Sequence, residues 1–288
     1  MTKPRNNLFI LSGGGMPGMD VLAGQLLALA DAGIVPSAIC GTSAGAGIGA
    51  LLAAGYPADQ VAQIIADLRD RDVRAERWLW KPRALWIDHF LEHDPIRKLL
   101  QRLLPADPTD LTIPYSCTTT RVTDGAEIRW SHPLLPGRPL TDLPGWREAV
   151  LASMSISGVF PWVCIPDAEG VQYYADGGVR AKLPLPANWR LFDVIYLLIG
   201  SYSNDYTGRG SSIMSRLLLH ASWYAQDQID DVIERCRRTA DSGLTTPPVT
   251  ILWPPRGHTG SLLRFDHKLI PSARARALNT LDNPPAAR

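Results

Sequence analysis

The sequence predicts an α/β fold in which a mixed central sheet carries helices on both faces. Two apolar runs, residues 7–11 and 37–40, each pass through small residues into a stretch with apolar residues at helical spacing. This alternating order predicts parallel strands joined by right-handed crossovers. Two later runs, 115–122 and 126–130, flank the turn-forming Thr123-Asp124-Gly125 and predict an antiparallel hairpin. A sheet that contains both kinds of pairing is mixed.

The remaining elements are predicted from periodicity and from residues that begin or end helices. Gly33 is the expected end of the first helix, and Pro57 and Pro95 stand at first-turn positions of later helices. Helices are expected over residues 19–32, in a stretch that ends at 54, from 57 onward, from 94 onward, over 143–155 and over 213–236. Further strands are expected over residues 162–165, 171–174, 192–199 and 249–253.

Composition limits the class of protein. The chain has 288 residues, of which 45% are hydrophobic and 20% are charged, so a large packed core is expected. No low-complexity linker marks a boundary, and we expect one domain over residues 1–288, with C-terminal helices that complete the fold. The formal net charge of +1 argues against a nucleic-acid binder that depends on a broad basic field.

Two features predict where the protein resides. No apolar run reaches the roughly 18 residues that span a bilayer, and no ordinary secretory signal precedes Gly13. The cysteines are widely spaced and form no zinc pattern: Cys40, Cys117, Cys164 and Cys236. A reduced, cytoplasmic compartment and the absence of a metal site are therefore expected.

Tryptophan and basic residues meet after a stretch of mixed charge. Trp78, Trp80 and Trp86 stand together with Lys81 and Arg83. Such a group can bind lipid headgroups, which predicts peripheral membrane contact. It can equally form a cap over the protein core, and we favour the cap because tryptophan is highly buried on average.

The stretch Gly41-x-Ser43-x-Gly45 joins the second strand to the second helix. A strand that turns sharply into a helix passes through a strained bend where only small residues fit. Such a bend exposes Ser43 at the positive end of the helix, which suits a nucleophile. The motif is short, and a plain Gly-rich turn is the alternative.

Two further glycine-rich segments accompany this elbow. Gly13-Gly14-Gly15 follows the first strand, and the spacing Gly13-x-Gly15-x-x-Gly18 also fits a dinucleotide-binding loop. The second strand ends in Cys40-Gly41 instead of the acidic residue that such a loop requires, which disfavours that alternative. Asp176-Gly177-Gly178 follows an apolar run and, taken alone, indicates an ordinary turn.

Taken together and in this order, the three segments resemble the patatin-like phospholipase family over roughly residues 7 to 200. The resemblance implies a patatin-like three-layer fold and hydrolysis of a lipid acyl ester, as a phospholipase A or related carboxylic ester hydrolase, through an acyl-serine intermediate. It implies a lipid or other acyl-ester substrate, with no cofactor and no metal.

The resemblance also implies a role for each matching residue. Ser43 is the expected nucleophile and Asp176 the expected base, in a Ser-Asp dyad where burial raises the pKa of the carboxyl group. Backbone N–H groups are the expected oxyanion donors: Gly13, Gly14, Gly15 and Ala44. Glycines are expected to support the elbow and the loops: Gly41, Gly45, Gly18, Gly177 and Gly178.

Two positions depart from the family's usual pattern. Met16-Pro17 stands where the Gly-rich run often has Arg or Lys, so the oxyanion loop lacks that cation and a phospholipid headgroup preference is in doubt. Lys182-Leu183-Pro184 stands where the family often has Asn before Pro, so no supporting amide can be assigned there.

Two alternatives involve different chemistry. A Ser-His-Asp esterase would use His220, His258 or His267 as its base. An inactive lipid-binding module would keep the fold without catalysis, although the intact Ser43, Asp176 and glycine set speak against it.

Overall fold

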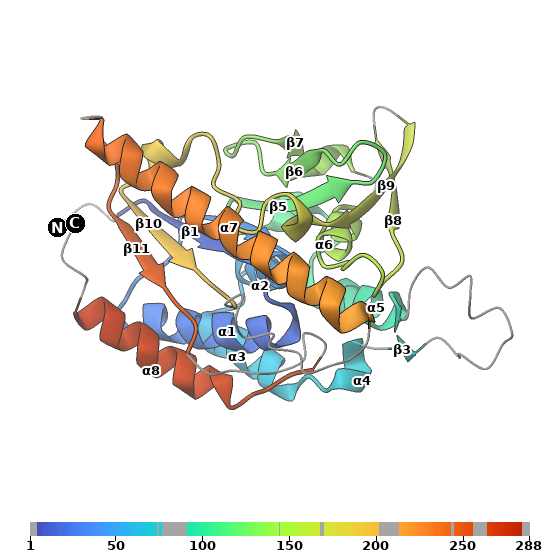
Figure 1. Ribbon diagram of the computed structural model, residues 1–288, viewed down its shortest axis with the longest axis horizontal. Coiled ribbons are helices and arrows are strands. Elements are labelled where there is room, and N and C mark those ends of the chain that lie inside the picture. The colour runs from blue at the N-terminus through green and yellow to red at the C-terminus, as the bar shows by residue number, and fades with distance from the viewer. Residues whose placement is uncertain are drawn as a thin grey trace, which may run out of the picture.

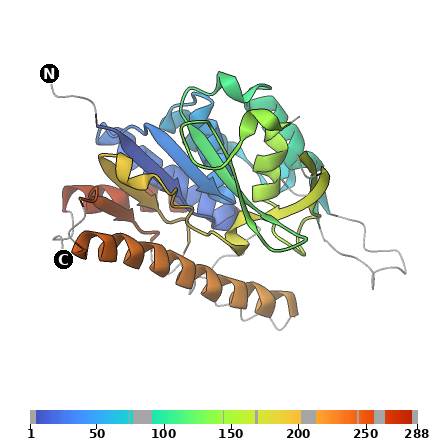
Figure 2. The ribbon, with the colours of Figure 1, turned by 90° about the horizontal axis from the view of Figure 1, so that it is seen from above.

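The computed structural model describes residues 5–73, 75–76, 91–143, 145–167, 170–201, 213–242, 245–255 and 264–283. A nine-stranded sheet forms the centre of the molecule, with helices on both sides (Figures 1 and 2). The predicted α/β class is confirmed. Trp78, Trp80 and Trp86 lie outside the described residues, so their expected role stays a prediction.

The sheet has a parallel half and an antiparallel half, as predicted. Its main path runs in the order β11 (Val249–Leu252), β10 (Val194–Leu198), β1 (Asn7–Leu11), β2 (Ala38–Thr42), β5 (Tyr115–Arg121), β6 (Glu127–Ser131) and β7 (Arg138–Pro139). The first five strands are parallel, and β6 is antiparallel to β5. A hairpin of β8 (Val163–Asp167) and β9 (Gly170–Asp176) joins the sheet where β9 pairs antiparallel with β5. Two short strands, β3 (Ala75–Glu76) and β4 (Leu91–Glu92), pair separately.

The helices divide between the two faces. The α-helices are α1 (Gly15–Asp31), α2 (Ala44–Ala53), α3 (Ala58–Asp67), α4 (Asp70–Val73), α5 (Asp94–Leu103), α6 (Trp146–Ser153), α7 (Ile213–Asp241) and α8 (Leu269–Asp282). The 3-10 turns are η2 (Pro108–Asp110), η3 (Leu140–Asp142), η4 (Gly177–Val179) and η5 (Trp189–Leu191). In the views of Figures 1 and 2, α7 crosses one face of the sheet, while α1, α2 and α3 lie on the other.

Strand β1 explains why the first apolar run is continuous. Phe9 and Leu11 pack into the core beneath α1 and α2, while Leu8 and Ile10 pack into a second core beneath α7. All four side chains are almost fully buried. A central parallel strand that is covered on both faces needs apolar residues at every position, because neither face meets water.

Several element boundaries differ from the sequence prediction. Helix α1 begins at Gly15 instead of residue 19, so the glycine loop is shorter than expected. Pro57 precedes α3 as its cap with extended backbone, and the helix itself starts at Ala58. Helix α7 continues to Asp241, five residues beyond its predicted end at 236.

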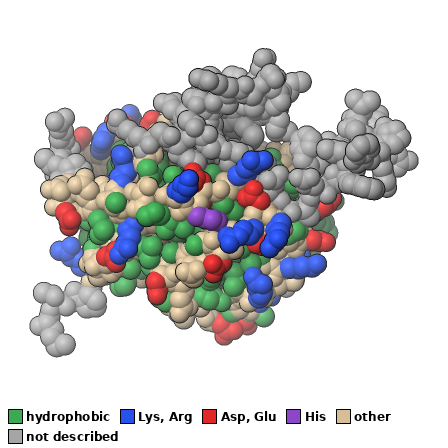
Figure 3. Space-filling view, turned by 90° about the horizontal axis from the view of Figure 1, so that it is seen from below, with side chains coloured by type: hydrophobic (Ala, Val, Ile, Leu, Met, Phe, Trp, Pro, Cys, Tyr) green, Lys and Arg blue, Asp and Glu red, His purple; other side chains and the backbone are tan. Residues whose placement is uncertain are grey.

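Charge is mixed on the face of the molecule that Figure 3 shows. On the face seen from below, acidic and basic side chains alternate around apolar ones (Figure 3), in keeping with a net charge near zero. Within the described residues, no helix has both the length and the apolar character needed to cross a membrane.

A buried polar cluster fastens the segment before α8 to α1. Asp20 is fully buried, and its Oδ2 accepts the backbone N–H of Asp266 at 2.7 Å. His267 Nδ1 lies 2.8 Å from Asp20 Oδ1, and His267 Nε2 lies 3.0 Å from the carbonyl oxygen of Leu68. Because a carbonyl oxygen only accepts, Nε2 carries the proton of that bond. The carboxyl and the imidazole therefore share one further proton.

Burial raises the pKa of Asp20, and the hydrogen bonds from His267 and Asp266 act in the opposite sense. We expect His267→Ala to leave this carboxyl buried with a missing partner and to lower the free energy of unfolding by about 1–3 kcal/mol. Urea unfolding measures the change. Ser272→Ala, an exposed position on α8, is the control and should change stability by less than about 0.5 kcal/mol. Equal stability of both variants would contradict this role for His267.

Candidate active site

Strand order and register bring the predicted site residues together. Ser43 directly follows β2, and Asp176 is the last residue of β9. Thr42 is in register with Thr118 on β5, and the next residue, Thr119, is in register with Asp176. Because β6 occupies the other edge of β5, β2 and β9 follow one another along the same edge of β5. Ser43 and Asp176 therefore meet where β2 ends, at the carboxyl edge of the parallel strands, where open α/β sheets form their crevices.

Ser43 stands in a strained bend. Its φ of 55° and ψ of −122° make it the one non-glycine residue with positive φ in the described part of the chain. Such a conformation costs on the order of 1–3 kcal/mol and persists only when the surroundings impose it. A Cβ at Gly41 would collide with the carbonyl oxygen of Gly45, and one at Gly45 would collide with that of Leu11. Both glycines of the elbow are therefore required by close backbone contact.

A serine that lies far away in the sequence holds the bend. The backbone N–H of Ser43 donates to Ser153 Oγ at 3.0 Å, and Ser153 Oγ donates to the carbonyl oxygen of Thr118 at 2.6 Å. Ser153 is fully buried at the end of α6. Its hydroxyl thus connects the elbow to β5.

Ser43 and Asp176 form a short hydrogen bond. Ser43 Oγ donates to Asp176 Oδ2 at 2.6 Å, and each residue is 6% exposed. The backbone N–H of Gly178 donates to the other carboxylate oxygen at 2.7 Å. The main chain of Asp176 is fixed as well, because its N–H donates to Ser155 O and its carbonyl accepts Thr120 Oγ1, both at 2.9 Å.

The environment makes Asp176 a stronger base than an exposed aspartate. Burial raises its pKa, while the hydrogen bonds from Ser43 and Gly178 and the charge of Lys182 act in the opposite sense. The net direction is upward. A buried carboxylate that already accepts the serine proton in a hydrogen bond has the geometry of a general base.

The Gly-rich loop lies next to Ser43, and its N–H groups differ in whether a hydrogen-bond acceptor is already present. Gly13 N–H is directed at the carbonyl oxygen of Lys182 over 3.4 Å. Gly14 caps α1 and packs against Gly18. Gly15 N–H and Ala44 N–H have no acceptor among the described residues, and both residues border the same hollow as Ser43. This hollow therefore presents two backbone donors beside the serine.

The glycines after Asp176 are confined by their neighbours. A Cβ at Gly177 would collide with the carbonyl oxygen of Thr118. A Cβ at Gly178 would lie 2.9 Å from Asp176 Oδ1, the atom that the Gly178 N–H binds. Larger residues at either position would displace the carboxylate from Ser43.

The hollow at Ser43 is mostly apolar. Its lining residues are Gly15, Met16, Met19, Ser43, Ala44, Val73, Ile96, Met154, Ile156, Phe160 and Phe265. The hollow is small, about 40 Å³, so its apolar lining offers a surface for the part of an acyl chain next to the ester and does not enclose a whole chain.

A Ser-His-Asp triad would use His220, His258 or His267, and the structure describes the side chain of His267 alone among these three. His258 and the side chain of His220 lie outside the described part of the chain. The ring of His267 is bound to Asp20 and Leu68, with no hydrogen bond to Ser43. Among the described side chains, the one bound to Ser43 Oγ is Asp176.

His93 is a further residue near the site, and the sequence alone does not indicate it. It is buried just before α5, stacks on Phe160, and its Nε2 lies 2.8 Å from Ser155 Oγ. Because Ser155 Oγ donates to Leu151 O at 2.6 Å, His93 Nε2 is the donor to the hydroxyl. The backbone carbonyl of Ser155 in turn accepts the N–H of Asp176, so His93 is connected to the main chain of Asp176 through Ser155 and not to Ser43.

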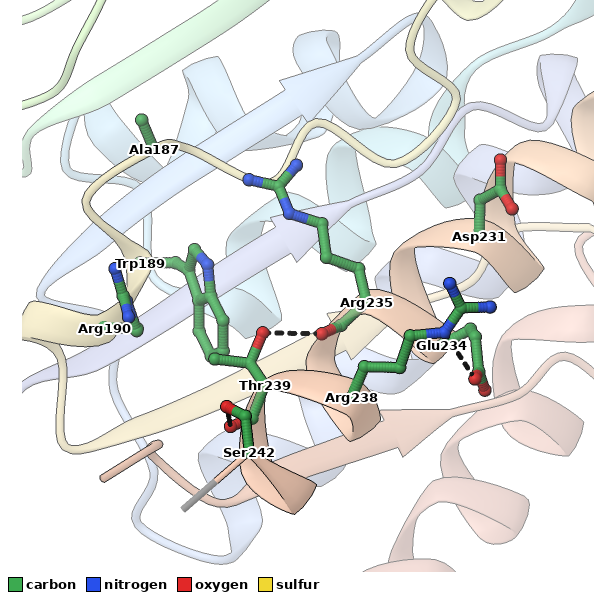
Figure 4. Close-up of a pocket in the computed structure, with 9 residues that line it drawn as sticks. All are labelled: Ala187, Trp189, Arg190, Asp231, Glu234, Arg235, Arg238, Thr239 and Ser242. Carbon is green, nitrogen blue, oxygen red and sulfur yellow. Dashed lines mark hydrogen bonds and ion pairs between the residues drawn. The ribbon is translucent and has the colours of Figure 1, made fainter. Parts of the chain in front are cut away.

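A second hollow of about 460 Å³ lies between η5 and the C-terminal half of α7 (Figure 4). Trp189, Arg190, Arg235 and Arg238 line it, together with acidic residues. Figure 4 shows the guanidinium groups pointing apart, and Arg238 is bound to Glu234. The hollow contains none of the predicted site residues. Elsewhere in the described chain, no three His, Cys, Asp or Glu side chains gather where a metal could bind.

The model of the patatin-like phospholipase family matches residues 9–189, more than half of the chain. The chain belongs to this family. No curated protein matches the sequence.

Solved structures with a similar fold come from bacteria and human. VipD from Legionella pneumophila is 14% identical, with a TM-score of 0.50 over 98% of this chain and 67% of VipD. Human GIVD cytosolic phospholipase A2 is 11% identical, with a TM-score of 0.45 over 75% of this chain and 48% of that protein. The type III effector ExoU of Pseudomonas aeruginosa is 16% identical, with a TM-score of 0.42 over 97% of this chain and 52% of ExoU. The likeness to VipD shows the fold, and the chain spans about half the length of the other two.

We expect Ser153→Ala to destabilise the elbow. The substitution removes the acceptor of a buried N–H and the donor to a buried carbonyl, which costs about 1–3 kcal/mol in the free energy of unfolding. Urea unfolding tests this. Thr118→Val is the matched control, because the Thr118 hydroxyl is buried without a partner in the described structure and its loss should cost nothing. A stable Ser153→Ala protein would show that the elbow holds its conformation without this bond.

Proposed function

We propose that the protein is a lipid acyl hydrolase that cleaves a carboxylic ester through an acyl-Ser43 intermediate. The observation that carries this proposal is the 2.6 Å hydrogen bond from Ser43 Oγ to the buried carboxylate of Asp176. Membership of the patatin-like phospholipase family supports the same activity. Among carboxylic ester hydrolases, we propose the phospholipase A type, which releases a fatty acid from a phospholipid.

In the first half of the reaction, Asp176 takes the hydroxyl proton as Ser43 Oγ attacks the ester carbonyl carbon. The carbonyl π electrons move to oxygen, which becomes an oxyanion. When the tetrahedral intermediate collapses, the C–O bond to the alcohol breaks and protonated Asp176 returns its proton to the leaving oxygen. The acyl group remains on Ser43.

In the second half, water replaces the alcohol. Asp176 takes one water proton as the water oxygen attacks the acyl carbon, and collapse of the second intermediate returns the proton to Ser43 Oγ. The products are an alcohol and a carboxylic acid. No step needs a metal or an organic cofactor.

The two backbone N–H groups beside the serine suit the oxyanion. Gly15 and Ala44 present donors without an acceptor among the described residues, in the hollow that contains Ser43. Donors that are already oriented stabilise the developing charge without reorganisation. Within the proposed donor set, these two are favoured over Gly13, whose N–H is directed at Lys182 O.

The substrate is proposed to be a lipid because the hollow is apolar. Methionine, isoleucine and phenylalanine side chains line it, and an acyl chain gains about 25 cal/mol for each Å² of apolar surface that it buries there. Peripheral membrane contact through Trp78 and Trp80 is the alternative to a cap over the core, and both this alternative and residence in the cytoplasm rest on the sequence alone.

We expect Ser43→Ala and Asp176→Asn to abolish most of the esterase activity. The first removes the nucleophile, and the second keeps the shape but cannot accept the proton, so kcat should fall at least 10²–10⁴-fold, the usual contribution of a general base. Hydrolysis of a short-chain ester measures kcat. A fluorophosphonate probe should label wild-type Ser43 and leave Ser43→Ala unlabelled.

Histidine variants separate the dyad from a triad. His220→Ala, His258→Ala and His267→Ala should each retain kcat within a few-fold of wild type once the folded fraction is taken into account. A folded histidine variant as inactive as Ser43→Ala would establish the Ser-His-Asp alternative. A wild-type protein that neither hydrolyses esters nor reacts with the probe would favour the inactive lipid-binding module.

The pH profile should reflect a buried carboxylate. The base must be ionised to act, so kcat/KM should fall as the pH drops through the pKa of Asp176. Burial raises that pKa, and the acid limb should therefore lie above the ordinary aspartate value of about 4. Measuring kcat/KM from acidic to neutral pH locates the limb. A limb at or below the ordinary value would contradict the environment described for Asp176.

A further inference from the structure

A lysine lies between the two loops of the site. The stem of Lys182 passes between Gly13 and Gly178: its Cδ is 3.5 Å from the point where Gly13 would carry a Cβ and 3.7 Å from the corresponding point on Gly178. Lys182 Nζ is 3.3 Å from the Gly13 point, which is itself 3.0 Å from Ser43 Cβ. The ammonium group is therefore close to the nucleophile, on the side of the loop that follows β1.

The backbone of Lys182 is held on both sides. Its N–H donates to Gln228 Oε1 at 2.7 Å, and its carbonyl oxygen accepts Gly13 N–H at 3.4 Å. The preceding carbonyl, that of Ala181, accepts Thr42 Oγ1 at 2.8 Å. Contacts from α7, from β2 and from the Gly-rich loop thus fix the residue in its position.

Within the described part of the chain, the ammonium group of Lys182 has no contact partner. Lys182 is half-buried, and its Nζ has no hydrogen-bond acceptor or contact ion pair among the described residues. It does interact electrostatically with Asp176. Lys182 is therefore a half-buried cation beside a carboxylate, with no contact ion pair among the described residues. Such a cation can stabilise negative charge wherever that charge lies within the site.

The proposed reaction explains why a cation is useful there. A Ser-Asp dyad carries one negative charge throughout: it starts on Asp176 and moves to the carbonyl oxygen when the carboxyl takes the Ser43 proton. A Ser-His pair would start neutral instead. In a site this buried, an uncompensated negative charge is costly, and the run from Gly13 to Gly18 contains no basic residue.

We propose that Lys182 is the cation of this active site, and that its ammonium group stabilises the negative charge as it passes from Asp176 to the substrate oxygen. The inference rests on the proposed function. It gives a role to a residue that departs from the family's usual pattern. The charge of Lys182 also lowers the pKa of Asp176 against the effect of burial, which keeps more of the base ionised.

The test compares Lys182→Met with wild type in an ester hydrolysis assay. Methionine keeps the unbranched stem without the charge. We expect kcat to fall about 10- to 100-fold, below the loss for a direct oxyanion donor, with a smaller change in KM. The acid limb of the pH profile should move to higher pH, because the pKa of Asp176 is no longer lowered by the ammonium group. Lys182→Arg should retain much of kcat and keep the limb near its wild-type position.

Arg180→Met is the matched control, since it removes one positive charge from an exposed side chain two residues away. It should leave kcat and the acid limb unchanged. Titration of active sites with the fluorophosphonate probe corrects each variant for folded protein, and Lys182→Gln provides a second uncharged side chain should methionine fold poorly. A purely structural role would lower the titrated fraction without moving the limb.

The outcomes separate this inference from the proposed function. An active wild type with an inactive Ser43→Ala, combined with wild-type kcat and pH profile in Lys182→Met, would overturn the role of Lys182 and leave the hydrolase intact. An inactive wild type, or an active Ser43→Ala, would overturn the proposed function itself.

Discussion

The hydrogen bond between Ser43 Oγ and Asp176 Oδ2 is the interaction on which the proposed chemistry depends, and it joins residues 133 positions apart in the chain. Sheet register creates it. Strand β5 pairs with β2 through its first half and with β9 through its second, along the same edge, which places Asp176 directly beside the elbow. Because side chains alternate between the two faces of a strand, a slip of one residue in β9 would turn the carboxylate to the opposite face. The antiparallel pairing of β9 with β5 therefore sets the geometry of the base.

The parts of this arrangement that are local in the chain could be predicted from the sequence. The apolar run of β1, the hairpin of β5 and β6 and the glycine-flanked turn at Ser43 each depend on neighbouring residues, and the structure contains all three. Contacts between distant segments could not be predicted. Nothing in the local sequence indicates that the Ser153 hydroxyl accepts the Ser43 N–H, or that the backbone carbonyl of Ser155 accepts the Asp176 N–H. His93 was missed because its partner is 62 residues away.

Charge places a further requirement on the surroundings of the carboxylate. Removing Asp176 from water favours its neutral form, which would be inactive as a base. The structure offsets this with hydrogen bonds from Ser43 and Gly178 and with the field of Lys182, yet the pKa stays raised. This intermediate condition suits a general base, because a fully stabilised carboxylate would take the serine proton poorly.

The strained backbone at Ser43 positions the nucleophile, as the surrounding charges prepare the base. The positive φ of the serine is held by the close approach of Gly45 to Leu11, by the bond from Ser43 N–H to Ser153 and by a bond from the Tyr115 hydroxyl to the first turn of α2 at 2.8 Å. These contacts all belong to the packed core, so folding imposes the bend before any substrate arrives. Positioning the nucleophile in advance removes part of the entropy that the reaction would otherwise lose on bringing Ser43, Asp176 and the ester together. The same core that buries the apolar faces of the sheet therefore also supplies the rigidity that the proposed dyad requires.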